Sequence, residues 1–382
     1  MKIVIAPDSY KESLSALEVA TQIELGFREI FPNATYVKVP MADGGEGTVQ
    51  AMAEATQGRI IHKPVTGPLG QTVQGFYALT GDGRMAMIEM AAASGLALVP
   101  PAQRNPAMTT SYGTGELIKA ALDAGARHLI IGLGGSATND AGAGMLQALG
   151  VKLLNADGQD IGRGGASLAQ LAHIDSSGMD ARLAECTIEV ACDVDNPLTG
   201  PRGASAIFGP QKGASPAMVS ALDAHLKHFA QLIQRDLDIT VEHVPGAGAA
   251  GGMGAALMAF LQGQLRPGCE IIAKAVGLDS AVQGATLVIT GEGRIDQQTI
   301  FGKTPFGVAH VARQHRVPVI GIAGSLGTNA HVVHDHGIDA IFSVLSRPCT
   351  IDDAVAEAAF NIRSSARNVA ATLAIGKQCQ RP

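Results

Sequence analysis

The sequence predicts an α/β protein with two domains. Short runs of branched apolar residues at 3–6, 129–133 and 188–191 are typical of buried parallel strands, and a loop rich in glycine or polar residues follows each of them. With 382 residues, of which 46% are apolar and 16% charged, the chain is long enough to bury more than one core.

The order of the predicted elements divides the chain. Strands and helices alternate at the start and again after residue 276, whereas 58–90 consists of β segments separated by turns. We therefore expect a discontinuous first domain, 1–65 plus 285–382, with 66–284 inserted as a second α/β domain. Two sequential domains are the alternative.

Composition excludes several classes of function. A formal charge of −6 without long basic runs argues against nucleic acid, and five cysteines without C-x-x-C spacing argue for reduced thiols rather than zinc or disulfides. Met1 leads directly into a strand rather than an export signal, and Pro245 and many glycines interrupt the longest uncharged region, 244–266. We expect a soluble, cytoplasmic protein that acts on a metabolite.

The first predicted strand, 2–6, is followed by a polar loop, 7–13, and then by a helix with a capping box formed by Ser15 and Glu18. Functional side chains gather at the carboxyl ends of strands in α/β sheets. Ser9 and Lys11 are therefore candidate contacts for an anionic substrate, although Lys11 could equally be a solvated loop lysine.

A second strand, 36–39, leads into a glycine-rich stretch that carries Asp43 and Glu46 before the next helix. Two carboxylates at such a strand exit can hold Mg²⁺ or a substrate hydroxyl. An acidic turn that caps the helix is the alternative.

The segment 128–149 combines a buried strand, the bare loop Gly134-Gly135-Ser136 and a helix of small residues. Glycines let backbone N–H groups approach a ligand, and the start of a helix favours anions. This order of parts predicts an anion cradle, with simple packing as the alternative. The run 132–137 is similar to the phosphate loop of kinases of the homoserine and mevalonate kinase type, but the rest of the chain does not follow that pattern.

The strand 188–191 ends in a loop that contains Asp193 and Asp195, which could act on a metal and a substrate hydroxyl. An Asp/Asn turn before proline is the alternative. Arg202 and Lys212 follow in glycine-rich loops and could pair with phosphate or carboxylate groups.

Two nucleotide-binding motifs are incomplete or out of context. The run 302–304 ends like a Walker A motif, but Gln297 stands where its first glycine belongs. The run 246–251 matches G-x-G-x-x-G, with Glu270 beyond it, which would suit a nicotinamide-dependent dehydrogenase of a small hydroxy acid. Its late position and the surrounding alanines and glycines favour close helix packing instead.

The polar loop 290–304 lies between a strand and a helix near the C-terminal end. Glu292, Asp296 and Lys303 offer partners for a metal, a hydroxyl and a phosphate, and Arg294 could bind a carboxylate with two N–H groups. A structural loop of ion pairs is the alternative.

Five blocks follow one another along the chain: 6–16, 43–48, 132–140, 193–198 and 291–296. In this order they resemble the bacterial type I glycerate kinases (glycerate 2-kinases), and the resemblance covers essentially the full length. Ala141-Gly142 departs slightly, since we expect two glycines there in the family. The resemblance implies ATP- and Mg²⁺-dependent phosphorylation of D-glycerate to 2-phosphoglycerate in sugar-acid metabolism. It also implies a fold in which the discontinuous domain is Rossmann-like and the inserted domain is flavodoxin-like.

Phosphoryl transfer requires a proton acceptor, charge neutralisation and groups that position both substrates. We expect a monomer or homodimer that binds ATP and D-glycerate between loops of the two domains; a non-catalytic sugar-acid-binding protein is the remaining alternative. The expected catalytic residues are Asp193, Lys11 and Asp296; the nucleotide contacts Gly134, Gly135, Ser136, Thr138 and Asn139; the substrate contacts Ser9, Lys11, Arg202, Glu292 and Arg294; and the metal ligands Asp43, Asp195 and Asp296.

Overall fold

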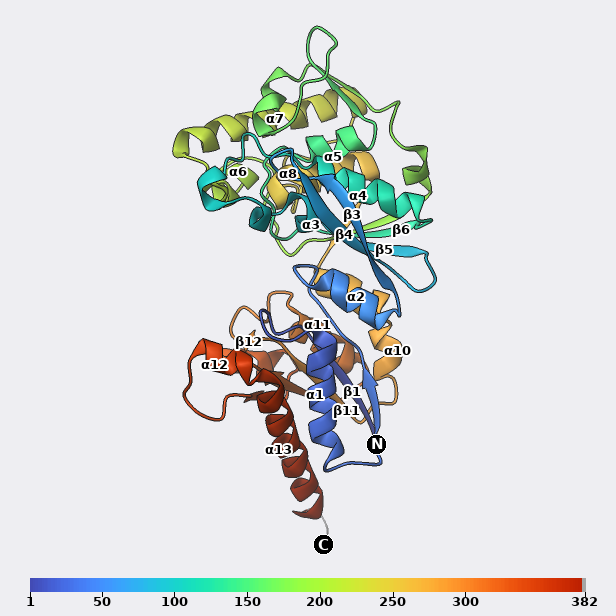
Figure 1. The fold of residues 1–382 in the computed structure, drawn as a ribbon, viewed down its shortest axis with the longest axis vertical. Helices are drawn as coiled ribbons and strands as arrows, with labels where there is room; N and C mark the ends of the chain where they lie inside the picture. The colour runs from blue at the N-terminus through green and yellow to red at the C-terminus, as the bar shows by residue number, and fades with distance from the viewer. Residues whose placement is uncertain (380–382) are drawn as a thin grey trace. The chain divides into compact units, whose positions relative to one another are not determined.

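A computed structural model describes residues 1–379, which fold into two compact units (Figure 1). Unit 1 comprises Met1–Asp43, Gln50–Gln57 and the chain from Gly268 onward, and unit 2 comprises Gly44–Val49 and Gly58–Pro267. The expected boundary near 65 lies inside a strand of unit 2, and the one near 285 follows two helices that pack within unit 1. The division therefore falls nearer to 57 and 267.

Unit 1 contains a sheet of five parallel strands in the order β15-β13-β11-β1-β2. Numbered along unit 1 alone, this is the order 2-1-3-4-5 of flavodoxin-like doubly wound sheets, so that label describes the discontinuous unit rather than the inserted one. The α/β class itself is confirmed. The strands are β1 (Lys2–Pro7), β2 (Thr35–Lys38), β11 (Leu287–Gly291), β13 (Val319–Ala323) and β15 (Ala340–Ser343).

Helices cover both faces of this sheet. The helix α1 (Ala16–Arg28) begins with the predicted capping box, in which Ser15 Oγ accepts from Glu18 N and the Glu18 carboxylate accepts from Ser15 N. It lies beside α13 (Ala358–Cys379) and packs against it (Figure 1). Apolar side chains of both helices join strand residues in one core. On the opposite face, α11 (Thr304–Gln314) packs against β1, β11 and β13 and contacts α9 (Gly268–Ala275) and α10 (Leu278–Val282).

Unit 2 contains a mixed sheet of six strands in the order β10-β9-β6-β5-β4-β3. The hairpin of β3 and β4 is antiparallel, β4 is antiparallel to β5, and the remaining pairs are parallel. The strands are β3 (Arg59–Thr66), β4 (Thr72–Leu79), β5 (Met85–Glu89), β6 (His128–Gly132), β9 (Thr187–Ala191) and β10 (Gln264–Arg266).

Four helices supply most of the helical residues in the core of unit 2: α4 (Tyr112–Asp123), α5 (Ala143–Ala148), α7 (Pro216–Leu237) and α8 (Ala249–Leu261). The C-terminal part of unit 1 forms two helices, because α12 (Ile351–Ala356) ends with Glu357 as its cap before α13 begins. The shorter elements are α2 (Thr48–Ala55), α3 (Ala91–Ser94), α6 (Ala204–Phe208), β7 (Lys152–Leu154), β8 (His173–Asp175), β12 (Arg294–Ile295) and β14 (Ser325–Leu326). Among the residues described, no helix has the length and apolar character needed to span a bilayer.

The glycines of 246–251 allow close packing. Residues 250–252 at the start of α8 have left-handed backbone angles. A Cβ on Gly251 would lie 1.9 Å from the carbonyl oxygen of Thr138, and one on Gly248 would lie 2.3 Å from that of Pro197. The described chain between α7 and this motif forms no strand, so the strand that leads into a dinucleotide-binding glycine turn is missing.

Candidate functional site

Polar side chains of unit 1 lie where the parallel strands end. Asp8 directly follows β1, and its carboxylate accepts hydrogen bonds from Ser9 N at 2.7 Å and from Thr304 Oγ1 at 2.6 Å. Burial raises the pKa of Asp8 to about 7, and the negative charges of Asp43 and Glu292 add to this increase. Asp8 is not among the predicted site residues, although its position next to Ser9 at a strand exit is the signal that could have identified it.

The loop after Asp8 is fixed by Tyr10, whose hydroxyl donates to the carbonyl oxygen of Ile322 at 2.5 Å. The loop closes through backbone hydrogen bonds between Tyr10 and Leu14. Lys11 is exposed, and no hydrogen bond or ion pair joins its ammonium to another described residue. A rigid loop therefore presents this cation to solvent beside the end of β1.

Glu292 directly follows β11 and is 9% exposed. Its Oε1 accepts from Thr299 Oγ1 at 2.7 Å, and its Oε2 lies 3.4 Å from Lys303 Nζ. Burial raises the pKa of this carboxyl group despite these two partners. Glu292 is thus a shielded acceptor near Asp8 rather than a surface charge.

Arg294 and Asp296 contact each other in the same loop. Arg294 Nε lies 3.3 Å from Asp296 Oδ2, while Asp296 Oδ1 accepts from Gln298 N at 2.8 Å. The Arg294 side chain is 61% exposed. The structural role that the sequence left open, a loop of ion pairs, is present, and the exposed guanidinium still has N–H groups for a ligand.

The carboxylates of unit 1 fit a magnesium ion. Within residues 1–379 no group of three or more His, Cys, Asp or Glu side chains is arranged to hold a metal by itself. Mg²⁺ usually takes one or two carboxylates and completes its shell with water and phosphate oxygens. Asp8 and Asp43 offer two such groups, and their mutual repulsion would be relieved by a cation.

In unit 2, the predicted anion cradle leaves the end of β6 as a loop. Gly134 and Gly135 are exposed, and Gly135 has a φ of +71°, which a side chain would strain. The loop is held at its edges, where Leu96 N donates to Gly135 O and Ala137 N donates to Ser94 O. No acceptor in the described chain is hydrogen-bonded to the amide N–H of Gly135.

Asp140 fixes the far end of this loop. Its fully buried carboxylate accepts from Ser111 N at 2.9 Å and from Ser111 Oγ at 2.8 Å, and also from the amide groups of Gly142 and Gly144. Burial raises its pKa. Asp140 lies in one of the five blocks, but the sequence did not show that it braces the loop.

Lys212 lies beneath the same loop and is only 2% exposed. Its Nζ donates to Ser136 Oγ at 2.7 Å and to the carbonyl oxygen of Thr138 at 2.7 Å. The sequence suggested Lys212 as a direct partner of a ligand, whereas the structure shows it bonded to the cradle itself.

The loop after β9 presents Asp193 and Asp195 on the surface of unit 2. Arg202 Nη2 lies 2.9 Å from Asp195 Oδ1 and 3.0 Å from its Oδ2, and both side chains are mostly exposed. A predicted substrate contact and a predicted metal ligand therefore neutralise each other here.

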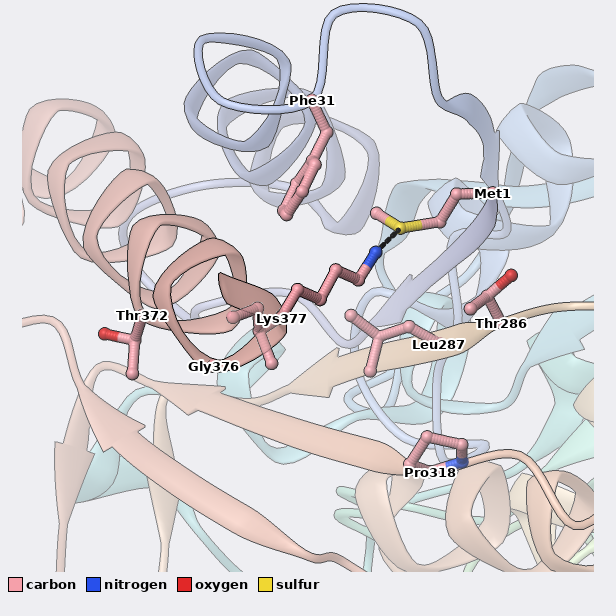
Figure 2. A pocket seen from close by; sticks show the side chains of 9 residues that line it. Met1, Phe31, Thr286, Leu287, Pro318, Thr372, Gly376 and Lys377 are labelled. Atoms are coloured by element: carbon pink, nitrogen blue, oxygen red, sulfur yellow. Dashed lines mark hydrogen bonds between the residues drawn. The ribbon is translucent and has the colours of Figure 1, made fainter. Parts of the chain in front are cut away.

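A cavity of about 330 Å³ lies at the opposite end of the unit 1 sheet, where strands begin (Figure 2). Met1, Leu287 and Pro318 line it beside the start of β1, β11 and β13. Lys377 reaches into it, with Nζ 3.4 Å from the Met1 sulfur and 5.2 Å from the Phe31 ring centre. The cavity lies at the amino ends of the strands, whereas the polar loops of the candidate site lie at their carboxyl ends.

The predicted site residues form one set in each unit, and every set lies at the carboxyl ends of the strands of its own sheet. The set of unit 1 is Ser9, Lys11, Asp43, Glu292, Arg294 and Asp296, and that of unit 2 is Gly134, Gly135, Ser136, Thr138, Asn139, Asp193, Asp195 and Arg202.

The glycine-rich loop after β6 is chemically suited to an anion, and the carboxylate cluster of unit 1 is chemically suited to a magnesium ion. Comparison with known proteins defines the class further. The chain belongs to the glycerate kinase family, whose model matches residues 3–374. The resemblance inferred from the five sequence blocks is thereby confirmed.

Relatives match over nearly their whole length. Glycerate 2-kinase of Escherichia coli K12 is 63% identical over 98% of this chain and 99% of its own, and glycerate kinase of Bacillus subtilis 168 is 58% identical over 99% of both. The crystal structure of a candidate glycerate kinase 2 from Salmonella typhimurium LT2 matches with a TM-score of 0.92 at 63% identity and covers 99% of both chains.

Proposed function

We propose that this protein transfers the γ-phosphoryl group of ATP to the 2-hydroxyl group of D-glycerate, giving 2-phospho-D-glycerate and ADP. The observation that carries the proposal is the 63% identity over 98% of the chain to a relative named glycerate 2-kinase. We place this activity in the cytoplasm, in the metabolism of sugar acids, and expect a monomer or homodimer.

The reaction forms a bond between the substrate hydroxyl oxygen and the γ-phosphorus and breaks the bond from that phosphorus to the oxygen bridging it to the β-phosphate. The hydroxyl proton must pass to a base, and charge accumulates on the phosphoryl oxygens. Asp193, exposed just after β9, is our candidate for the base. A carboxylate at such a strand exit can accept a proton from a substrate hydroxyl.

The substrate carries a carboxylate and two hydroxyl groups, so it requires cations and acceptors. Lys11 supplies an ammonium from a rigid loop, and Ser9 beside it supplies a hydroxyl. Arg294 retains N–H groups for a carboxylate, and the shielded Glu292 can accept from a substrate hydroxyl. Arg202 would serve the same purpose only after release from Asp195.

When bound, Mg²⁺ would neutralise charge on the phosphate oxygens, and Asp43 with Asp8 beside it is the pair that we expect to hold it. Asp195 and Asp296 are the other metal candidates, and each already faces an arginine. We assign the loop 134–139 to the phosphate groups of the nucleotide, because its exposed glycines leave backbone N–H groups accessible.

Coupled ADP release tests the proposed function. Purified protein with ATP and Mg²⁺ should release one ADP for each D-glycerate consumed. D-Lactate, which keeps the carboxylate and the 2-hydroxyl but lacks the second hydroxyl, is the matched control and should react more slowly. Binding of D-glycerate without ADP release would instead support the sugar-acid-binding alternative and overturn the proposed reaction.

A further inference from the structure

Lys212 is an unusual residue in the core of unit 2, because an ammonium group is rarely buried without a carboxylate partner bonded to it. Its two hydrogen-bond partners are a hydroxyl and a carbonyl of the anion loop, and both bonds are 2.7 Å long. Asp140 is the carboxylate whose charge acts on it, but the hydrogen bonds of Asp140 go to backbone N–H groups and to Ser111. The positive charge is therefore directed at the loop.

The chain around Lys212 is shaped to hold it there. Lys212 ends a short 3₁₀ turn that begins at Pro210, and Gly213 follows with a φ of +94°. A Cβ at Gly213 would lie 2.3 Å from the carbonyl oxygen of Arg104, so only glycine lets the turn approach this closely. The turn sets the ammonium under Ser136 and Thr138 although these residues are more than seventy positions away in sequence.

A second observation indicates that the loop can bind a ligand. Thr138 and Asn139 are fully buried, yet Thr138 Oγ1 and Asn139 Oδ1 have no hydrogen-bond partner in the described chain. Buried polar atoms are rarely left unpaired, since each costs about 1–3 kcal/mol. The Asn139 oxygen can only accept a hydrogen bond, whereas the Thr138 hydroxyl can donate one to a phosphate oxygen. The Lys212 ammonium also has a third proton beyond its two bonds to the loop.

We propose that Lys212 is a positioning residue for phosphate binding: it holds the loop 134–139 in the shape that receives a phosphate group and supplies the positive charge behind that group. The inference rests on the proposed function, because that function assigns the loop to the nucleotide. Lys212 acts through Ser136 and the Thr138 carbonyl, to which it is bonded.

Because the ammonium group of Lys212 can lose or take up a proton, its role in phosphate binding can be measured through the pH dependence of binding. Burial lowers the pKa of Lys212 to about 7, and the charge of Asp140 partly offsets this effect. Arg104 is the charged residue on the segment that contacts Gly213. A bound phosphate group favours the charged ammonium, so binding should raise this pKa and take up a proton. Affinity should correspondingly fall as the pH rises above about 7.

Calorimetry tests this with ADP as the probe. Titrations at pH 8 in buffers of different ionisation enthalpy give the number of protons taken up, and we expect more than about 0.5 per ADP for the wild-type protein. Lys212→Met should bind ADP at least about tenfold more weakly and take up no proton. Lys152→Met, which removes a mostly exposed lysine of the same unit, is the matched control and should behave as wild type.

The outcomes separate this inference from the proposed function. Unchanged ADP affinity in Lys212→Met, or wild-type binding without proton uptake, would overturn the role of Lys212. The proposed function is tested separately, by D-glycerate turnover of the wild-type protein. If the wild-type protein does not bind ADP, the nucleotide assignment fails, and tripolyphosphate becomes the probe: binding with proton uptake supports the role of Lys212, and no binding refutes it. Proton uptake on ADP binding is measured on the wild-type protein, so this test remains possible even if Lys212→Met fails to fold.

Discussion

Replacing Asp8 with asparagine should stabilise unit 1 as the pH rises and lower turnover, so the two effects can be measured separately. Asp8 is partly buried, and burial together with the charges of Asp43 and Glu292 raises the pKa of its carboxyl group from 3.8 to about 7. Asparagine keeps the shape and an oxygen that can accept from Ser9 N and Thr304 Oγ1. The substitution removes a charge that the folded state disfavours.

The sign and size follow from linkage. Because the pKa is higher in the folded state, the folded protein binds the extra proton between pH 4 and 7, and the ionised group destabilises it increasingly as the pH rises to about 7. Each pH unit in this window contributes about 1.4 kcal/mol. The free energy of unfolding of Asp8→Asn minus that of the wild type should therefore increase by about 2–3 kcal/mol from pH 5 to pH 8.

Urea unfolding followed by circular dichroism measures this difference, which suits a chain without tryptophan. Asp335→Asn, at an exposed aspartate of unit 1, is the matched control and should show no such change with pH. Turnover of Asp8→Asn should fall at least about tenfold if Asp8 serves the reaction. A difference in stability that is the same at pH 5 and pH 8 would refute the electrostatic account of this cluster.

Three further substitutions test the assigned roles. Asp193→Asn should lower turnover by a factor of about 100 or more without changing the melting temperature, and near-normal turnover would remove Asp193 as the base. Asp43→Asn should raise the Mg²⁺ concentration needed for half-maximal rate, so an identical Mg²⁺ titration would count against it. Gly251→Ala should lower the free energy of unfolding by about 2–4 kcal/mol, because its Cβ would meet the Thr138 carbonyl. Gly158→Ala, at a glycine with positive φ and open space around it, should lower the free energy of unfolding by only about 1 kcal/mol. Equal losses would show that the close contact is unimportant.

Local signals in the sequence were sufficient for much of the fold. The capping box of Ser15 and Glu18 fixes the start of α1. The strands expected at 2–6, 36–39, 129–133 and 188–191 match β1, β2, β6 and β9 to within one residue at each end. The loops after β1, β6, β9 and β11 do follow strands as the sequence indicated, and the function assigned to their residues stays a prediction.

Contacts between distant positions were beyond these signals. Nothing local to Lys212 shows that its ammonium bonds to Ser136. The raised pKa of Asp8 likewise depends on its burial and on the charges of Asp43 and Glu292 at two other strand exits. The pairing of Asp195 with Arg202 and the left-handed start of α8 likewise depend on how separate loops pack. Sequence patterns report the faces and ends of elements, whereas these features arise only when the elements come together.

The most direct test of the proposed function is the position of the phosphate in the product. Carbon 2 of glycerate carries one hydrogen and carbon 3 carries two, so the phosphorus resonance of the product reports its attachment by its splitting. Protein incubated with ATP, Mg²⁺ and D-glycerate should give a new ³¹P signal split into a doublet by the single hydrogen of carbon 2. A triplet, which indicates attachment at carbon 3, or the absence of any new phosphate ester would contradict the account.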